Sequence, residues 1–246
     1  MDEQERRCKS RFSFSCAIMS TSALLKAAME ELAASGEAPP LGFEPSKLGT
    51  IEHWESVYKR EVAMHKEIGD EGEVWFGEDA AEAMKDWAEE YCPPNDDLNI
   101  LDSASFTPSL PHLTASRADT IILTIVGSGN GQLLFVMHEA NYANLTGIDY
   151  SPSSIQLSNA IAEQRSISDV TFIVCDVLTQ ELPTKEAERW GLILDKGTYD
   201  AISLSDEIID GSTLRELYPA RIARLLKPGG IFLITSCQFF TFGFGS

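Results

Sequence analysis

The chain has 246 residues, 43% of them apolar, and this length suits one sizeable α/β domain better than two. No apolar run approaches the roughly 18 residues of a membrane-spanning helix, which predicts a soluble protein without a membrane partner. The 38 acidic residues outnumber the 19 basic ones, and the resulting charge of -19 argues against nucleic acid but allows a basic protein partner. The acid excess could also serve solubility alone.

The first 40 residues contain few core-forming positions, and we predict that residues 1–40 form a flexible N-terminal tail. The domain is expected to cover residues 41–246. Its first predicted helix begins after Thr50, whose hydroxyl can cap the helix start, and it carries Trp54, Val57 and Tyr58.

A pair of aromatic residues, Trp75 and Phe76, lies between glycines in the run GEVWFGE (72–78). Aromatic residues in a glycine-flanked loop are usual at the lip of a ligand site, where a planar ring covers the ligand. The alternative is a hydrophobic staple for the next predicted helix, over residues 79–91.

Two apolar runs compete for the first strand of the sheet. Residues 98–102 begin like a strand that ends in Asp102, and the run TIILTIV (120–126) begins like a second one. Between them, residues 103–119 have no clear period and are too long for an ordinary α/β connection. We therefore predict that residues 103–119 form an inserted loop.

A glycine loop follows the second run, with Gly127, Gly129 and Gly131 at alternate positions. Glycines allow positive φ and a close approach of the backbone to a ligand, and the helix start after them offers free N–H groups. Asp149 ends the next predicted strand, 18 residues after Gly131, where a carboxylate can accept hydrogen bonds from ribose hydroxyls. This order predicts a nucleoside site.

The spacing of the loop distinguishes between nucleosides. The dinucleotide fingerprint needs glycine or alanine at position 132, which is Gln132, and a P-loop needs Lys followed by Ser or Thr. GxGxG followed by a strand-end acid is typical of S-adenosylmethionine sites. The plainer alternative is a glycine turn in an ordinary parallel sheet.

The alternation of strands and helices continues to the end of the chain. Ser151 and Pro152 predict a helix start, and a buried-type strand over 170–175 leads to Asp176, which can accept from an adenine amine beside the Val177 backbone. Alternatively, Asp176 only caps the turn. Strands at 190–194 and 231–235 flank a helix at 212–226. This pattern predicts a mostly parallel sheet with its ligand at the carboxyl ends of the strands.

The five cysteines include no CxxC pair, and the four histidines lack metal-ligand spacing. These patterns favour a reducing compartment and predict no metal site.

Four runs together resemble the seven-strand S-adenosylmethionine-dependent methyltransferases, whose fold is a doubly wound Rossmann-like sheet. They are GSGNG (127–131), GIDYSPSSIQLS (147–158), DKGTYDAISL (195–204) and LKPGGIFLITSC (226–237). LGTIEHWESVYKRE (48–61) and GEVWFGE (72–78) narrow the resemblance to the elongation factor 1-alpha lysine methyltransferases. The resemblance covers about residues 41–237. It implies cytoplasmic methyl transfer from S-adenosylmethionine to a lysine of that translation factor.

By position, the resemblance also implies roles for individual residues. Asp195, at the end of the fourth strand, would be the catalytic residue where the target lysine meets the sulfonium. The cofactor-binding residues would be Gly127, Ser128, Gly129, Asn130 and Gly131 at the methionine end, Asp149 at the ribose, Tyr150, Asp176 and Val177 at the adenine, and Trp75 at the lip.

The chain departs from the family pattern in two places. The family has an acid two positions before the first glycine, where this chain has Ile125, and Asp102 lies beyond the insertion. The family also continues into a last strand pair, which we expect this sheet to lack, leaving the strand at 231–235 as an open edge. These departures keep a non-catalytic partner-binding protein as one alternative. A small-molecule methyltransferase is a second, whereas Gln132 disfavours a nicotinamide oxidoreductase.

Overall fold

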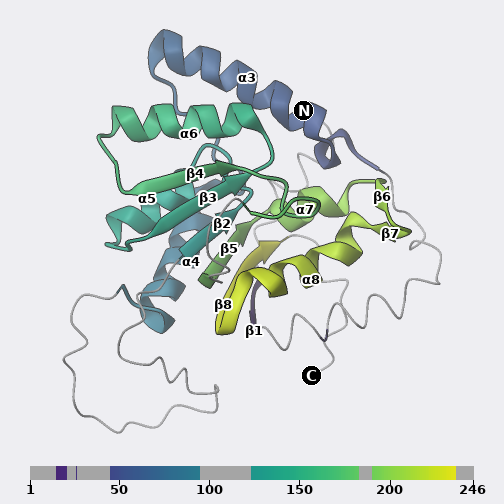
Figure 1. The fold of residues 1–246 in the computed structure, drawn as a ribbon. Coiled ribbons are helices and arrows are strands. Elements are labelled where there is room, and N and C mark those ends of the chain that lie inside the picture. The colour runs from purple at the N-terminus through teal and green to yellow at the C-terminus, as the bar shows by residue number, and fades with distance from the viewer. Residues whose placement is uncertain (1–14, 21–25, 27–44, 95–122, 183–189, 237–246) are drawn as a thin grey trace, which may run out of the picture.

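The computed structural model describes residues 15–20, 26, 45–94, 123–182 and 190–236, and its centre is a six-stranded sheet (Figure 1). The strand order is β1-β8-β5-β2-β3-β4, and every neighbouring pair is parallel except β1 with β8. The fold is therefore the predicted doubly wound, mostly parallel α/β sheet. Its strands are β1 (Ser15–Ser20), β2 (Leu123–Val126), β3 (Leu145–Asp149), β4 (Val170–Val174), β5 (Trp190–Lys196) and β8 (Leu226–Ser236).

Helices cover both faces of this sheet (Figure 1). One apolar cluster joins α4 and α5 to β2, β5 and β8, and a second joins α8 to the opposite face through Tyr218 and Ile222. Helix α6 packs on β3 and β4, and α3 lies over α6. The helices are η1 (Lys47–Gly49), α3 (Ile51–Ile68), α4 (Gly77–Tyr91), α5 (Gln132–Glu139), α6 (Pro152–Gln164), α7 (Thr198–Ser203) and α8 (Leu214–Leu225). None of the described helices is long and apolar enough to span a bilayer.

Two predicted helix starts are confirmed by their caps. The Thr50 hydroxyl accepts from the His53 N–H at the start of α3, and the Ser151 hydroxyl accepts from the Ser154 N–H at the start of α6. A capping box at Thr213 begins α8. Two short features were not predicted, namely α7 and the hairpin of β6 (Ile208–Ile209) and β7 (Ser212–Thr213).

The central strand comes from the second of the two competing runs. Leu123–Val126 forms β2 and pairs with β3 on one side and β5 on the other, so the residues before the glycine loop occupy the middle of the sheet. Ile125 is 2% exposed and packs into the cluster with α4 and α5. Asp102, the predicted strand at 98–102 and the predicted inserted loop at 103–119 lie outside the described residues.

The edge beside β8 is not open, contrary to the sequence-based expectation. Strand β1, within the segment predicted to be a tail, pairs antiparallel with β8, from Ser15 opposite Ser236 to Ser20 opposite Ile231. The prediction failed because it counted only strands that follow β8 in the chain. Pairing depends on free N–H and C=O groups, which a segment from either end of the chain can supply.

The connections reverse direction between β2 and β5. From β2 the chain proceeds through β3 to β4, and the later strands are added on the other side as β5 and then β8. The loops that leave the carboxyl ends of β2 and β5 therefore diverge and open a crevice, which is where doubly wound sheets bind ligands.

Candidate functional site

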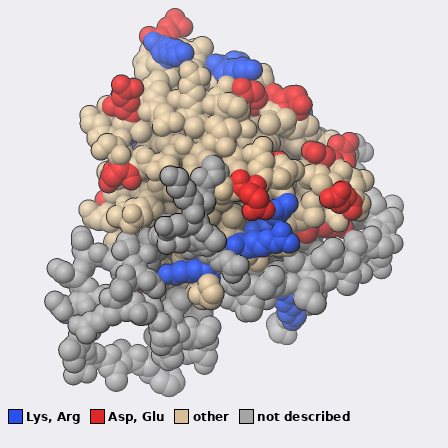
Figure 2. Space-filling view, viewed as in Figure 1, with Lys and Arg blue, Asp and Glu red and all other residues tan. Residues whose placement is uncertain are grey.

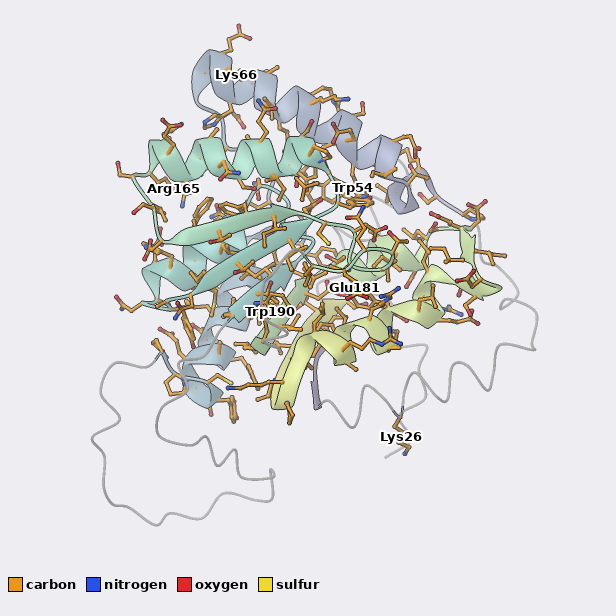
Figure 3. The ribbon with its side chains drawn as sticks, viewed as in Figure 1. Lys26, Trp54, Lys66, Arg165, Glu181 and Trp190 are labelled. Carbon is orange, nitrogen blue, oxygen red and sulfur yellow. The ribbon has the colours of Figure 1, made fainter. Side chains whose placement is uncertain are left out.

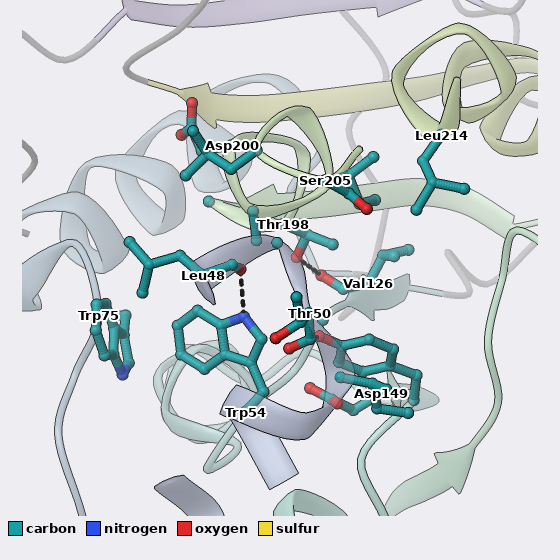
Figure 4. A pocket seen from close by; sticks show the side chains of 18 of the residues that line it. Leu48, Thr50, Trp54, Trp75, Val126, Asp149, Thr198, Asp200, Ser205 and Leu214 are labelled. Carbon is teal, nitrogen blue, oxygen red and sulfur yellow. Dashed lines mark hydrogen bonds between the residues drawn. The ribbon is translucent and has the colours of Figure 1, made fainter. Parts of the chain in front are cut away.

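A pocket of about 620 Å³ lies in this crevice (Figure 4). It is lined by the carboxyl ends of β2, β3, β5 and β8, by the start of α3 and by residues 73–77. Six predicted site residues line it, whereas Ser128, Gly129, Asn130, Gly131 and Asp195 do not. The six are Trp75, Gly127, Asp149, Tyr150, Asp176 and Val177.

The three loop glycines all have positive φ, but a different residue lies close to each of them. Only Gly127 lines the pocket, and a Cβ atom on it would lie 1.9 Å from the Thr198 hydroxyl oxygen. A Cβ atom on Gly129 would lie 2.7 Å from the Tyr58 hydroxyl oxygen, and a Cβ on Gly131 would lie 3.0 Å from the Phe172 ring. In this structure, Gly129 and Gly131 therefore make room for side chains of α3 and β4.

Asp149 joins the pocket to the glycine loop. Its carboxylate accepts from the Gly129 N–H and from the Ser151 N–H, each at 2.9 Å. The residue is buried, and burial raises its pKa above the ordinary value, while these two hydrogen bonds act in the opposite direction. Because a carboxylate has about four acceptor positions, two bonds leave capacity for hydroxyl donors from the pocket.

The other two loop residues hold neighbouring segments. The Asn130 amide donates to the carbonyl oxygens of Glu71 and Glu73, at 3.0 and 3.4 Å. The Ser128 N–H donates to the Ile148 carbonyl oxygen. The Ser128 hydroxyl is buried and has no hydrogen-bond partner among the described residues. Asn130 thus connects the loop to the segment that leads to Trp75.

Aromatic rings form one wall of the pocket. The rings of Trp54 and Trp75 meet edge to face with centroids 4.8 Å apart, and the Trp54 indole N–H donates to the Leu48 carbonyl. Both Trp75 and Phe76 line the pocket, as expected for a ligand lip. This wall provides apolar surface for a planar ligand group.

After β4, Asp176 caps a turn and also lines the pocket. Its carboxylate accepts from the Leu178 N–H at 2.9 Å and from the Thr179 hydroxyl at 2.5 Å, so it caps the turn. It also lines the pocket beside Val177, and Tyr150 lines the same region while its hydroxyl donates to the Thr50 carbonyl.

The structure does not bring Asp195 to the pocket, which corrects its expected position. The side chain is completely buried, and its carboxylate accepts from the N–H groups of Thr198 and Tyr199 and from the Tyr218 hydroxyl. Burial raises the pKa of Asp195 to about 7, against the effect of these hydrogen bonds. The carboxylate points into the fold because it caps α7, so it supports the β5–α7 turn.

Three residues beside Asp195 do line the pocket and were not predicted as site residues: Lys196, Thr198 and Asp200. The Lys196 ammonium donates to the Trp75 carbonyl, and the Thr198 hydroxyl donates to the Val126 carbonyl at 2.8 Å. Asp200 accepts from the Ser236 hydroxyl at 2.8 Å. Their position at the end of the central strand β5 and in the first turn after it was the signal that could have identified them.

The chain is similar to known proteins over most of its length. A family model described as a methyltransferase domain matches residues 125–241. A protein-lysine N-methyltransferase efm4 from Schizosaccharomyces pombe is 41% identical over 80% of this chain and 78% of its own. An EEF1A lysine methyltransferase 2 from Homo sapiens is 37% identical over 80% of this chain and 71% of its own.

Solved structures are more distant. A SAM-dependent methyltransferase from Thiobacillus denitrificans, in complex with S-adenosyl-L-homocysteine, is 23% identical over 46% of this chain and 41% of its own, with a TM-score of 0.35.

Proposed function

Because this chain belongs to the family of EEF1A lysine methyltransferase 2 and protein-lysine N-methyltransferase efm4, we propose that it methylates a lysine of elongation factor 1-alpha. The methyl donor is S-adenosylmethionine. The identity of 41% over 80% of the chain is the observation that carries this proposal. The pocket at the carboxyl ends of β2 and β3 supports it, because it lies where such a donor would bind.

The residues present fit this cofactor. Asp149 has acceptor capacity toward the pocket and would hold the ribose hydroxyls, while Gly127 lines the pocket and would contact the methionine end. Tyr150 and Val177 would flank the adenine, and Asp176 would face its amine. Ser128, Gly129, Asn130 and Gly131 would act from behind the pocket surface by fixing the loop.

The cofactor supplies the methyl group, and the protein supplies position and a dry environment. The target amine must be neutral and in line with the methyl group, whereas a lysine in water has a pKa of about 10.4. Apolar walls such as Trp54 and Trp75 exclude water and favour the neutral amine. Asp195 would act as a positioning residue, because its carboxylate holds the β5–α7 junction that carries Lys196 and Thr198.

The charge of the chain suits a basic protein substrate. Acidic side chains are spread over the described part of the face in Figure 2, and Glu52, Glu73, Asp206 and Glu207 line the pocket. The net charge of -19 would attract a lysine-bearing surface and repel nucleic acid. Elongation factor 1-alpha acts in the cytoplasm, so a cytoplasmic location is part of the proposal.

A transfer assay with labelled S-adenosylmethionine and purified elongation factor 1-alpha tests this function. Wild-type protein is expected to label one or more lysines, and Asp149→Ala is expected to lose most of the transfer. The exposed substitution Lys66→Met is the matched control, since Lys66 lies at the far end of α3 (Figure 3). Absence of labelling with the wild type would overturn the proposal.

A non-catalytic, partner-binding protein is the second candidate. The observation that favours it is Ile125, which is buried where the family pattern places an acid under the glycine loop. Calorimetric titration with S-adenosylmethionine separates the two functions. An absence of heat at millimolar cofactor, together with retained binding of elongation factor 1-alpha, would leave only the second candidate.

A further inference from the structure

The segment that carries Trp75 lines the pocket and is held by two attachments. We call residues 72–77 the strap. At its start, the Arg165 guanidinium donates to the Glu71 carboxylate, with Nε and Oε1 at 2.9 Å, and the Asn130 amide donates to the Glu71 and Glu73 carbonyls. The start of the strap is therefore fixed to the glycine loop and to the end of α6.

The other attachment is made by two adjacent residues at the β5–α7 junction, Lys196 at the end of β5 and Gly197 after it. The Lys196 ammonium donates a hydrogen bond to the Trp75 carbonyl. The ring of the next strap residue, Phe76, occupies the space where Gly197 lacks a side chain, because a Cβ there would lie 2.2 Å from Phe76 Cε2. Two consecutive residues of the strap thus meet two consecutive residues of the turn.

The backbone at this contact is held in an uncommon conformation. Phe76 has φ +65° and Gly197 has φ +92°, and a left-handed conformation is unfavourable for a phenylalanine unless neighbouring contacts fix it. The Lys196 hydrogen bond and the Gly197 space are such contacts. Burial lowers the pKa of Lys196 to about 8, so the ammonium form still predominates at pH 7.

We propose that Lys196 and Gly197 form a latch that positions the strap, and with it the Trp75 ring, over the pocket. Lys196 acts through Trp75 and is a positioning residue of the reaction. The kinetic consequence of the latch depends on the proposed methyltransferase function, whereas the latch itself does not. The two can therefore fail independently.

Hydrogen exchange of the protein without substrate tests the latch directly. The Gly77 N–H, which donates to the Val74 carbonyl at 3.0 Å, is the reporter amide within the strap. Lys196→Met keeps the side-chain length but removes the donor, and it is expected to speed exchange in the strap at least tenfold. Lys196→Gln keeps an N–H donor without the charge. The strap amides of this variant should therefore exchange more slowly than those of Lys196→Met.

Phe76→Ala removes the ring that packs on Gly197 and so weakens the latch from the strap side. It is a second test in case the Lys196 variants do not fold. It should also speed exchange of the strap, with no change in α6 peptides. Lys66→Met, on the exposed surface of α3, is the control and should match the wild type (Figure 3). Unchanged strap exchange in Lys196→Met, or equal exchange in the Met and Gln variants, would overturn the latch.

The kinetic readout separates positioning from a general loss of structure. With elongation factor 1-alpha as substrate, Lys196→Met is expected to lower kcat about tenfold or more, because small displacements of positioning groups are costly. Lys196→Gln should recover part of that loss at an unchanged melting temperature. An equal loss in both variants would contradict a role for the hydrogen bond in positioning.

Discussion

The backbone N–H of Gly129 donates to the carboxylate of Asp149 at 2.9 Å, so the acid at the end of β3 fixes the glycine loop at the end of β2. The family pattern assigns support of this loop to an acid before the first glycine, a position that holds Ile125 here. Asp149 therefore has two tasks in this chain. It orients the loop and presents its remaining acceptor positions to the pocket.

Substitution of Asp149 should consequently lower the affinity for the cofactor and remove a hydrogen bond that holds the glycine loop. Asp149→Asn keeps one acceptor oxygen, whereas Asp149→Ala leaves the Gly129 and Ser151 N–H groups without their partner. We expect a loss of S-adenosylmethionine affinity of about tenfold for Asn and at least a hundredfold for Ala, measured by calorimetry. Equal affinity in Asp149→Ala and wild type would exclude Asp149 from the site.

The sequence predicted the parts of the site that depend on strand order. Gly127, Asp149 and Asp176 were expected at one edge of the sheet, because parallel strands end there, and all three line the pocket. Side-chain direction was not accessible in this way. Asp195 is at a strand end too, yet its carboxylate turns inward to cap α7, a helix that the sequence did not predict.

The local features of the fold were also predictable from the sequence, whereas its long-range contacts were not. Caps at Thr50 and Ser151 are local, so their residues sufficed to predict helix starts. The pairing of β1 with β8 joins segments more than 200 residues apart, for which no local pattern exists. The positions of Lys196 and Trp75 relative to one another depend in the same way on tertiary structure.

Introducing the family acid at Ile125 should destabilise this chain. The side chain at this position packs among apolar residues such as Leu133 and Met137, so Ile125→Asp would bury a carboxylate without a partner. We expect the unfolding free energy to fall by about 3 kcal/mol or more, measured by urea denaturation. Ile125→Val, with an expected loss of about 1 kcal/mol, is the control. A stabilised Asp variant with tighter cofactor binding would contradict the buried position of Ile125.

Asp195 should matter more for stability than for chemistry. Asp195→Asn keeps an acceptor for the α7 cap but weakens its bonds to Thr198, Tyr199 and Tyr218. We expect a loss of about 1–3 kcal/mol in unfolding free energy and less than a tenfold fall in kcat for the folded protein. A hundredfold fall in kcat at unchanged stability would instead restore Asp195 as the catalytic residue.

The same variant exposes a pH dependence. The pKa of Asp195 is about 7 in the folded chain, above its ordinary value of 3.8, so between these pH values the folded state binds more protons than the unfolded state. Stability contributed by this group must then fall as pH rises from about 4 to about 7, by on the order of 1 kcal/mol per pH unit. Asp195→Asn lacks the titrating group. The unfolding free energy of wild type minus that of the variant should decrease over this range in denaturation at pH 5, 6 and 7, and an increase would contradict the raised pKa.

Removal of β1 should expose the edge of the sheet. Strand β8 carries apolar residues such as Leu233 and Ile234, and without Ser15–Ser20 its outer N–H and C=O groups would lose the strand that pairs with them. Deletion of residues 1–20 is therefore expected to lower the melting temperature by several degrees and to promote self-association, whereas deletion of residues 1–14 keeps β1 and serves as the control. Light scattering coupled to size-exclusion chromatography, at matched concentrations, measures the difference. If both truncated proteins had the same oligomeric state and the same melting temperature, β1 would not be the strand that closes this edge.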